Sequence, residues 1–189
     1  MIIKELFACP VFQQKLDNYE LKDYVIGLST NNNSVKKSNT GGWQSDQFTK
    51  PEKEFESLWK SIEFSLNKYH QSLQLIGTVY ISDLWFNING KGDSNKPHSH
   101  PNSVHSGTFY INTPKNCGNI FFEHPCSSIA WAYPNNIIGV GNVVNSGSWW
   151  FPADKSWLYI FPSYLIHWVE GNLSDESRIS LAFNTQVRL

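Results

Sequence analysis

The chain has 189 residues, of which 40% are hydrophobic and 15% aromatic, which is enough to build the core of one folded domain. This composition excludes a disordered chain, and the formal net charge of −1 offers no basic field to hold nucleic acid, so no nucleic-acid partner is expected. There is no signal-peptide pattern and no apolar run long enough to span a membrane, so we expect no membrane contact and a cytoplasmic location.

The first 74 residues are expected to form a strand and helices that pack on a sheet. A strand is predicted over 5–16, a short helix over 19–28 and a polar loop over 31–42. The clearest helix follows Thr49, the expected N-cap, which has Glu52 as its capping-box partner. Its apolar stripe has the spacing of one helix face: Phe55, Leu58, Trp59, Ile62, Leu66 and Tyr69.

The pattern changes to β at about residue 75, so we expect a single domain over 1–189 with a β core over 75–189. Short apolar or alternating runs, separated by turn residues, predict a sandwich or barrel. The predicted strands are 75–89, 106–112, 119–123, 128–133, 137–145, 148–151, 156–161, 165–170 and 178–187.

Three of these strands, 84–89, 106–111 and 178–184, have one apolar face and one face rich in hydrogen-bonding groups. In an ordinary antiparallel sheet the polar face is open to solvent. Alternatively, the polar faces converge on a wet cavity while helices cover the apolar faces.

A possible metal site is indicated by His98-x-His100 and by His167, which lies 69 residues after His98. On an extended segment residues i and i+2 point to the same side, so both imidazoles of the pair can face one ion. Imidazoles suit iron, zinc, copper or nickel. Arg178-x-Ser180 follows, and its guanidinium and hydroxyl could grip a carboxylate, although a surface ion pair with Asp175 or Glu176 is the ordinary alternative.

Together these features resemble the iron(II)/2-oxoglutarate-dependent oxygenase superfamily, and within it a branch met in marine bacteria and their phages. The resemblance implies a mainly β, double-stranded β-helix (jelly-roll, cupin-like) barrel with N-terminal helices, which uses iron(II) and 2-oxoglutarate. The segments that carry it are Trp85–Asn89, Asn95–Pro101, Ser106–Tyr110, Gly118–Phe122, Phe161–Ser163 with His167, and Arg178–Asn184.

The resemblance also implies roles for individual residues. His98 and His167 match the two histidine ligands, and Arg178, helped by Ser180, matches the clamp on the far carboxylate of 2-oxoglutarate. Asn87 and Tyr110 match further cosubstrate-binding positions.

This sequence departs from the family where a ligand carboxylate is usual, because His100 stands there. Either His100 is the third ligand, or the metal takes a carboxylate such as Glu123 or Asp93, or the position stays open. The primary substrate, a small molecule or a peptide, is not readable from the sequence, hydroxylation is the default reaction, and a homodimer is compatible with the sequence. The candidates for contacting substrate or forming a lid are Trp43, Gln44, Trp149 and Trp150.

Two other functions stay open at this stage. A cupin-type three-histidine metalloprotein would share the barrel but would not need Arg178-x-Ser180. A non-catalytic jelly-roll binding or virion module could use the eight Trp residues as a platform, and its histidines would then be incidental.

Overall fold

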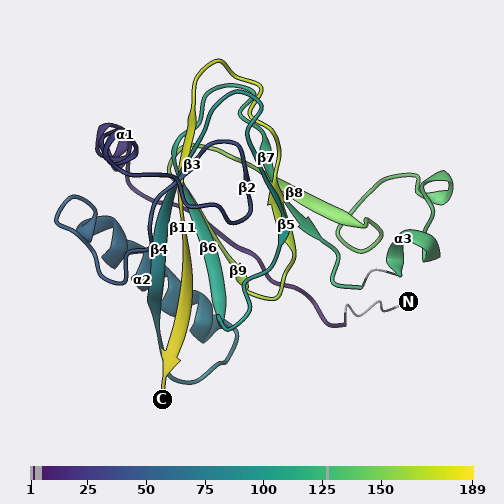
Figure 1. The fold of residues 1–189 in the computed structure, drawn as a ribbon. Coiled ribbons are helices and arrows are strands. Elements are labelled where there is room, and N and C mark those ends of the chain that lie inside the picture. The colour runs from purple at the N-terminus through teal and green to yellow at the C-terminus, as the bar shows by residue number, and fades with distance from the viewer. Residues whose placement is uncertain (1, 3–5, 127) are drawn as a thin grey trace.

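The computed structural model describes residues 2, 6–126 and 128–189, and its strands form two antiparallel sheets that face each other (Figure 1). The larger sheet contains, in spatial order, β1 (Phe12–Lys15), β9 (Trp157–Pro162), β6 (His105–Asn112), β11 (Arg178–Arg188), β4 (Thr78–Asn89) and β3 (Trp43–Gln44). The smaller sheet contains β2 (Asn39–Thr40), β5 (Ser94–His98), β10 (His167–Val169), β7 (Asn119–Glu123) and β8 (Ser148–Pro152). The described strands form two separate sheets and no closed barrel.

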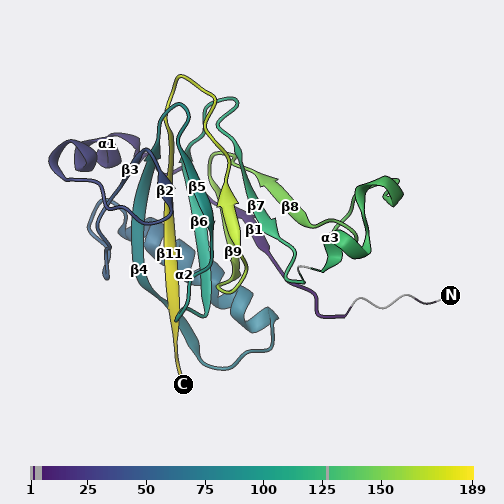
Figure 2. The same ribbon diagram turned by 45° about the vertical axis from the view of Figure 1, so that its right-hand side comes forward.

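Two helices, α1 (Lys22–Asn31) and α2 (Glu56–Ser72), lie on the outer face of the larger sheet (Figure 2). They pack mainly on β4, and α2 also reaches β9. All six residues of the predicted apolar stripe are 5% exposed or less, which confirms the stripe and its role in packing on a sheet. No helix in the described part of the chain is long and apolar enough to cross a membrane.

The predicted capping box at the start of the long helix is wrong. The helix begins at Glu56, its N-cap is Phe55, and no side chain caps it. The Glu52 carboxylate instead accepts a hydrogen bond from the Tyr24 hydroxyl at 2.9 Å, so it ties α1 to the turn before α2. Glu52 therefore makes a tertiary hydrogen bond in place of the helix cap that the local sequence pattern predicted.

The segment between β7 and β8 also differs from the prediction. Strands were expected over 128–133 and 137–145, but the structure has a short helix α3 (Ile129–Ala132) and a 3-10 turn η1 (Asn135–Ile137). Because β7 and β8 pair directly with each other, residues 124–126 and 128–147 have no strand beside them and project from the body (Figure 1). Conversely, β2 and β5 form where polar loops were predicted, because both find partners in the smaller sheet.

The polar faces of the three alternating strands converge, as one of the two interpretations predicted. In the larger sheet Ser180 of β11 lies opposite Asn87 of β4 and Tyr110 of β6. The other face of the same strand carries Ile179, Leu181 and Phe183, which are fully buried in the core beneath the helices. The polar residues therefore point away from the helices, toward the smaller sheet, and we call this side of the larger sheet its inner face.

We expect the helix–sheet interface to contribute much of the stability. Leu66→Ala on α2 should lower the free energy of unfolding by about 2–5 kcal/mol, because Leu66 is 0% exposed and its loss leaves a cavity. The matched control on the same helix is Phe64→Ala, since Phe64 is 63% exposed and should cost much less. Urea unfolding measures both, and equal losses would contradict this packing.

Candidate metal and cosubstrate site

The pairing of β5 with β10 brings the three predicted histidines together. His98 at the end of β5 lies directly opposite His167 at the start of β10. His100 follows two residues later, and its backbone N–H donates to the Ser163 carbonyl at 2.9 Å. One ring nitrogen from each of the three lies within 4.8 Å of the others, and the Nε2 atoms of His100 and His167 are 3.3 Å apart.

Hydrogen bonds to backbone carbonyls orient two of these rings. Nδ1 of His98 lies 2.7 Å from the Lys96 carbonyl, and Nδ1 of His167 lies 2.9 Å from the Leu165 carbonyl. A carbonyl only accepts hydrogen bonds, so each Nδ1 carries the proton. Each Nε2 then presents a lone pair to the space that the three rings share, which is how proteins commonly set the tautomer of a metal ligand.

The surroundings keep the three imidazoles neutral. Burial, reinforced by repulsion from His98, lowers the pKa of His167 to about 3 and that of His100 to about 4. Burial also lowers the pKa of His98. Neutral imidazoles are the form that binds metals, so the set is ready for a divalent cation at neutral pH.

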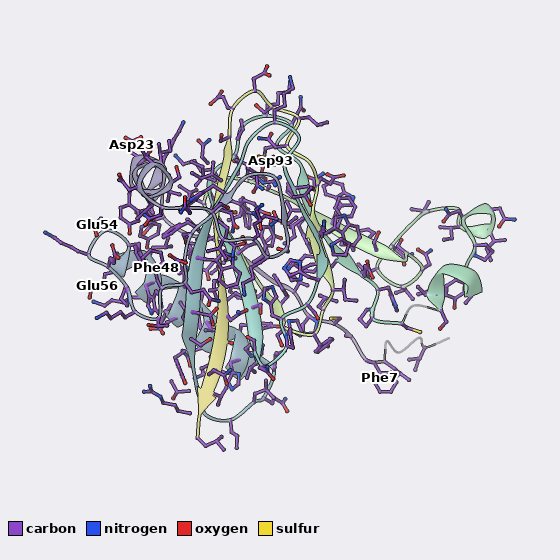
Figure 3. The ribbon with its side chains drawn as sticks, viewed as in Figure 1. Phe7, Asp23, Phe48, Glu54, Glu56 and Asp93 are labelled. Atoms are coloured by element: carbon purple, nitrogen blue, oxygen red, sulfur yellow. The ribbon has the colours of Figure 1, made fainter. Side chains whose placement is uncertain are left out.

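Within the described residues, these three histidines are the one group of His, Cys, Asp and Glu side chains close enough to share an ion. Asp93 lies at the turn between β4 and β5 (Figure 3), where its Oδ2 accepts from the Gly90 N–H at 2.7 Å. Glu123 is next to Phe122 on β7 and points to the opposite face of that strand, since Phe122 packs toward His167. Neither carboxylate joins the group.

Arg178 is fully buried, at 1% exposure, at the first position of β11. Its Nη1 donates to two backbone carbonyls, of Cys117 and Glu170. Among the described residues no carboxylate lies within 4.0 Å of the guanidinium. Of the two expected partners, Asp175 pairs with Lys91 instead, and Glu176 forms no ion pair with Arg178. The alternative of a surface ion pair at Arg178 is therefore wrong.

Three of the four buried polar atoms that lack a partner among the described residues belong to this site. They are Nη2 of Arg178, the hydroxyl of Tyr110 and Oδ1 of Asn87. Burial raises the pKa of Tyr110, so its hydroxyl keeps a proton to donate. Ser180 lies between Asn87 and Tyr110 in the same row of the sheet. Nη2 of Arg178 and the Tyr110 hydroxyl are unmet donors that fit a carboxylate ligand, so these residues suit 2-oxoglutarate as the three histidines suit iron(II).

Gly118 makes room for the guanidinium, a role that the sequence alone did not reveal. It has φ +86°, and a Cβ there would lie 2.9 Å from the Glu170 carbonyl and 3.1 Å from Nη1 of Arg178. Any larger residue would be strained and would press on the clamp. One hint was present, because Gly118 belongs to a segment that carried the resemblance.

The four predicted substrate or lid residues separate into two pairs. Gln44 is 4% exposed and lies opposite Asn87, so it joins the polar row of the inner face. Trp149 lies opposite Phe122 and shares the face that carries His167. Trp43 packs on the outer core with its Nε1 bonded to the Asn32 carbonyl, and Trp150 points to the other face of β8.

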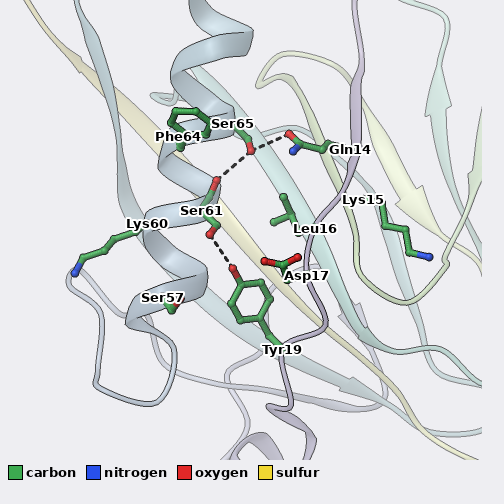
Figure 4. A pocket seen from close by; sticks show the side chains of 10 residues that line it. All are labelled: Gln14, Lys15, Leu16, Asp17, Tyr19, Ser57, Lys60, Ser61, Phe64 and Ser65. Atoms are coloured by element: carbon green, nitrogen blue, oxygen red, sulfur yellow. Dashed lines mark hydrogen bonds between the residues drawn. The ribbon is translucent and has the colours of Figure 1, made fainter.

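Two other polar features lie apart from this site. The groove between β1 and α2 is lined by Gln14, Asp17 and Tyr19 and by α2 serines (Figure 4), and it contains none of the predicted site residues. A second histidine pair joins α2 to β6, with Nδ1 of His70 lying 3.0 Å from Nε2 of His105.

Comparisons with known proteins agree with this geometry. A family model described as "Putative 2OG-Fe(II) oxygenase" matches residues 83–184, more than half of the chain. A search of curated proteins finds no match. The prediction of a marine bacterial or phage branch is not tested by these comparisons.

Solved structures show the same fold at low sequence identity. A prolyl-4-hydroxylase from Pseudomonas putida has a TM-score of 0.64 and 14% identity, covering 95% of this chain and 93% of its own. A viral collagen prolyl hydroxylase from Paramecium Bursaria Chlorella virus-1, solved with 2OG, has a TM-score of 0.60 and 13% identity, covering 94% and 96%. HygX from Streptomyces hygroscopicus, solved with nickel and 2-oxoglutarate, has a TM-score of 0.62 and 7% identity, covering 95% and 83%. These similarities confirm the predicted double-stranded β-helix fold.

The buried histidine pair should make the stability of the metal-free protein depend on pH. Burial and the adjacent His70 lower the pKa of His105 to about 4, from 6.5 for a free histidine. Below pH 6.5 the unfolded chain therefore takes up a proton that the folded state refuses, so the free energy of unfolding falls as the pH drops toward 4.

Urea midpoints at pH 7 and pH 5, measured with a chelator present, should show this loss. The decrease should be smaller in His105→Asn and unchanged in His124→Asn, whose side chain is half-buried and lies outside the pair. A decrease of the same size in His105→Asn and the wild type would contradict the assignment.

Proposed function

Because the chain belongs to the 2OG-Fe(II) oxygenase family, we propose that it is an iron(II)- and 2-oxoglutarate-dependent dioxygenase that hydroxylates a small-molecule or peptide substrate. The observation that carries this proposal is the buried guanidinium of Arg178, which has an unmet Nη2 and no carboxylate partner among the described residues. A cupin-type metalloprotein without 2-oxoglutarate would have no use for such a group.

His98, His100 and His167 would hold the iron. Their carbonyl-bonded Nδ1 atoms fix the rings of His98 and His167, and neutral donors leave the full charge of the cation available to an anionic cosubstrate. Two nitrogens that are each about 2.1 Å from one metal and roughly at right angles lie about 3 Å apart. The 3.3 Å between the Nε2 atoms of His100 and His167 fits that spacing.

Arg178 would receive the far carboxylate of 2-oxoglutarate on Nη2, with the hydroxyls of Tyr110 and Ser180 as further donors. When bound, iron(II) and 2-oxoglutarate together supply oxygen activation, which is driven by oxidative decarboxylation of the cosubstrate. The chain's own contribution is orientation. Arg178 is tied to two carbonyls before any ligand arrives, so little conformational freedom is lost on binding.

Aromatic side chains would keep water from one side of the metal. The ring of His167 lies 4.6 Å from that of Phe161 and 6.1 Å from that of Phe122, both of which are buried between the sheets. On this proposal, substrate would approach from a side that these rings leave open. Of the predicted contact residues, Trp149 lies next to Phe122 on the shielded side, and Gln44 lies beside Asn87 in the row proposed for the cosubstrate.

The proposal is tested by separating metal binding from cosubstrate binding in calorimetric titrations. His167→Ala should weaken metal binding by at least about tenfold, because it removes one of three ligands. Arg178→Met should leave metal binding intact but weaken the binding of 2-oxoglutarate to the metal-loaded protein by about 100-fold.

The matched controls are His124→Ala and Arg188→Met, whose side chains lie outside the site. Both should bind metal and 2-oxoglutarate like the wild type. Unchanged metal binding in His167→Ala would refute the ligand assignment. A wild-type protein that binds metal but not 2-oxoglutarate would favour the cupin-type function.

A further inference from the structure

The inner face of β11 places four residues in a line from one end of the site to the other. They are Arg178, Ser180, Ala182 and Asn184, which alternate with the buried apolar residues of the outer face. Residues two apart on a strand are separated by about 6.7 Å, so Asn184 lies roughly 20 Å from Arg178 along the strand. Ser180, Ala182 and Asn184 each lie opposite one residue of β4 and one residue of β6.

The three histidines lie level with the far end of this line. Trp85, opposite Ala182, has its ring 5.8 Å from that of His100. Ser106 pairs with both Asn184 and Phe161, and the Phe161 ring is 4.6 Å from that of His167. The row of Asp83, Asn184 and Ser106 therefore borders the histidines on the side away from Arg178.

A carboxylate stands in this row. Oδ1 of Asp83 accepts hydrogen bonds from the side chains of Asn184 at 3.0 Å and Gln47 at 2.8 Å, and Oδ2 accepts from Ser82 at 2.8 Å. The Ser106 hydroxyl donates to Asn184 at 3.0 Å and so fixes that amide. A carboxylate has about four acceptor positions, so one on Asp83 stays open. The side chain is half-buried, and it is therefore both positioned and accessible.

Three segments next to the histidines contain no charged side chain, whereas the segment that carries Gln47 also carries Asp46 and Lys50. Residues 97–106, 148–153 and 163–167 contain no Asp, Glu, Lys or Arg. The open oxygen of Asp83 therefore gives this side of the site a negative charge that no cation within those three segments cancels.

We propose that Asp83 recognises a positively charged, hydrogen-bond-donating group of the primary substrate, such as a guanidinium or an ammonium. The proposal rests on the function proposed above, because it assumes that Arg178 takes the cosubstrate and leaves the opposite end to the substrate. Asn184 and Ser106 are positioning residues that hold the carboxylate toward that group. A substrate that is anionic at this point would be repelled.

The test uses three small probes of equal chain length: n-butylguanidinium, butyramide and butyrate. A guanidinium stays protonated and does not bind metals, so it reports on the carboxylate alone. Protein loaded with cobalt(II) and 2-oxoglutarate would relax the proton signals of a probe that lies near the metal, and zinc(II)-loaded protein is the diamagnetic reference. We expect n-butylguanidinium to bind most tightly and butyrate least.

The variants separate recognition from a purely structural role of Asp83. Asp83→Asn should weaken the binding of n-butylguanidinium about fivefold and leave the binding of butyramide unchanged. Asp83→Glu should still bind n-butylguanidinium more tightly than the other two probes. Asp175→Asn is the matched control, since it removes the same charge from an exposed position beside Lys91 and should change nothing.

The possible outcomes are distinct. Equal binding of the three probes to the wild type, or an unchanged preference in Asp83→Asn, would overturn the proposal even if cobalt(II) and 2-oxoglutarate bind as expected. Loss of 2-oxoglutarate binding in the wild type would instead refute the function on which it rests. The comparison of probes on the wild type does not depend on the folding of any variant.

Discussion

The site is organised by one buried charge. Removing a guanidinium from water without an anionic partner costs several kcal/mol, and Arg178 is 1% exposed with two carbonyls as its partners. The fold tolerates this because β11 is a central strand, paired on both sides, and because Gly118 lets the carbonyl of Glu170 approach. What the arrangement lacks is a carboxylate in contact with the guanidinium, and Nη2 has no partner among the described residues.

At the metal site, what is lacking is negative charge. Three neutral imidazoles bring no negative charge to a divalent cation, whereas the usual family set includes a carboxylate. The charges of iron(II), three neutral imidazoles and the dianion of 2-oxoglutarate sum to zero. Each of the two cofactors would therefore neutralise the charge of the other. Linkage then requires that 2-oxoglutarate strengthens metal binding by the same factor by which metal strengthens 2-oxoglutarate binding. The substitution of His100 for a carboxylate would thus make the metal depend more on the cosubstrate.

The sequence predicted the parts whose signals are local. The stripe of α2, the alternation of β4, β6 and β11, and the spacing of His98, His100 and Arg178-x-Ser180 could all be read from neighbouring residues. The strand β5 was missed because its residues, Ser-Asn-Lys-Pro-His, are those of a turn, and only pairing with β2 and β10 makes it a strand. The capping box failed for the same kind of reason, since Glu52 bonds to Tyr24 on another helix. The two carbonyls that hold Arg178 could not be predicted from the sequence, because every residue has a backbone carbonyl.

The most direct test of the account is a crystal structure of the protein grown with iron(II), without oxygen, and with 2-oxoglutarate, using anomalous scattering to locate the metal. We expect an iron peak within about 2.2 Å of the Nε2 atoms of His98, His100 and His167. We also expect the far carboxylate of 2-oxoglutarate on Nη2 of Arg178. An iron bound by Asp93 or Glu123, or a 2-oxoglutarate that leaves Arg178 without an anion, would contradict the account.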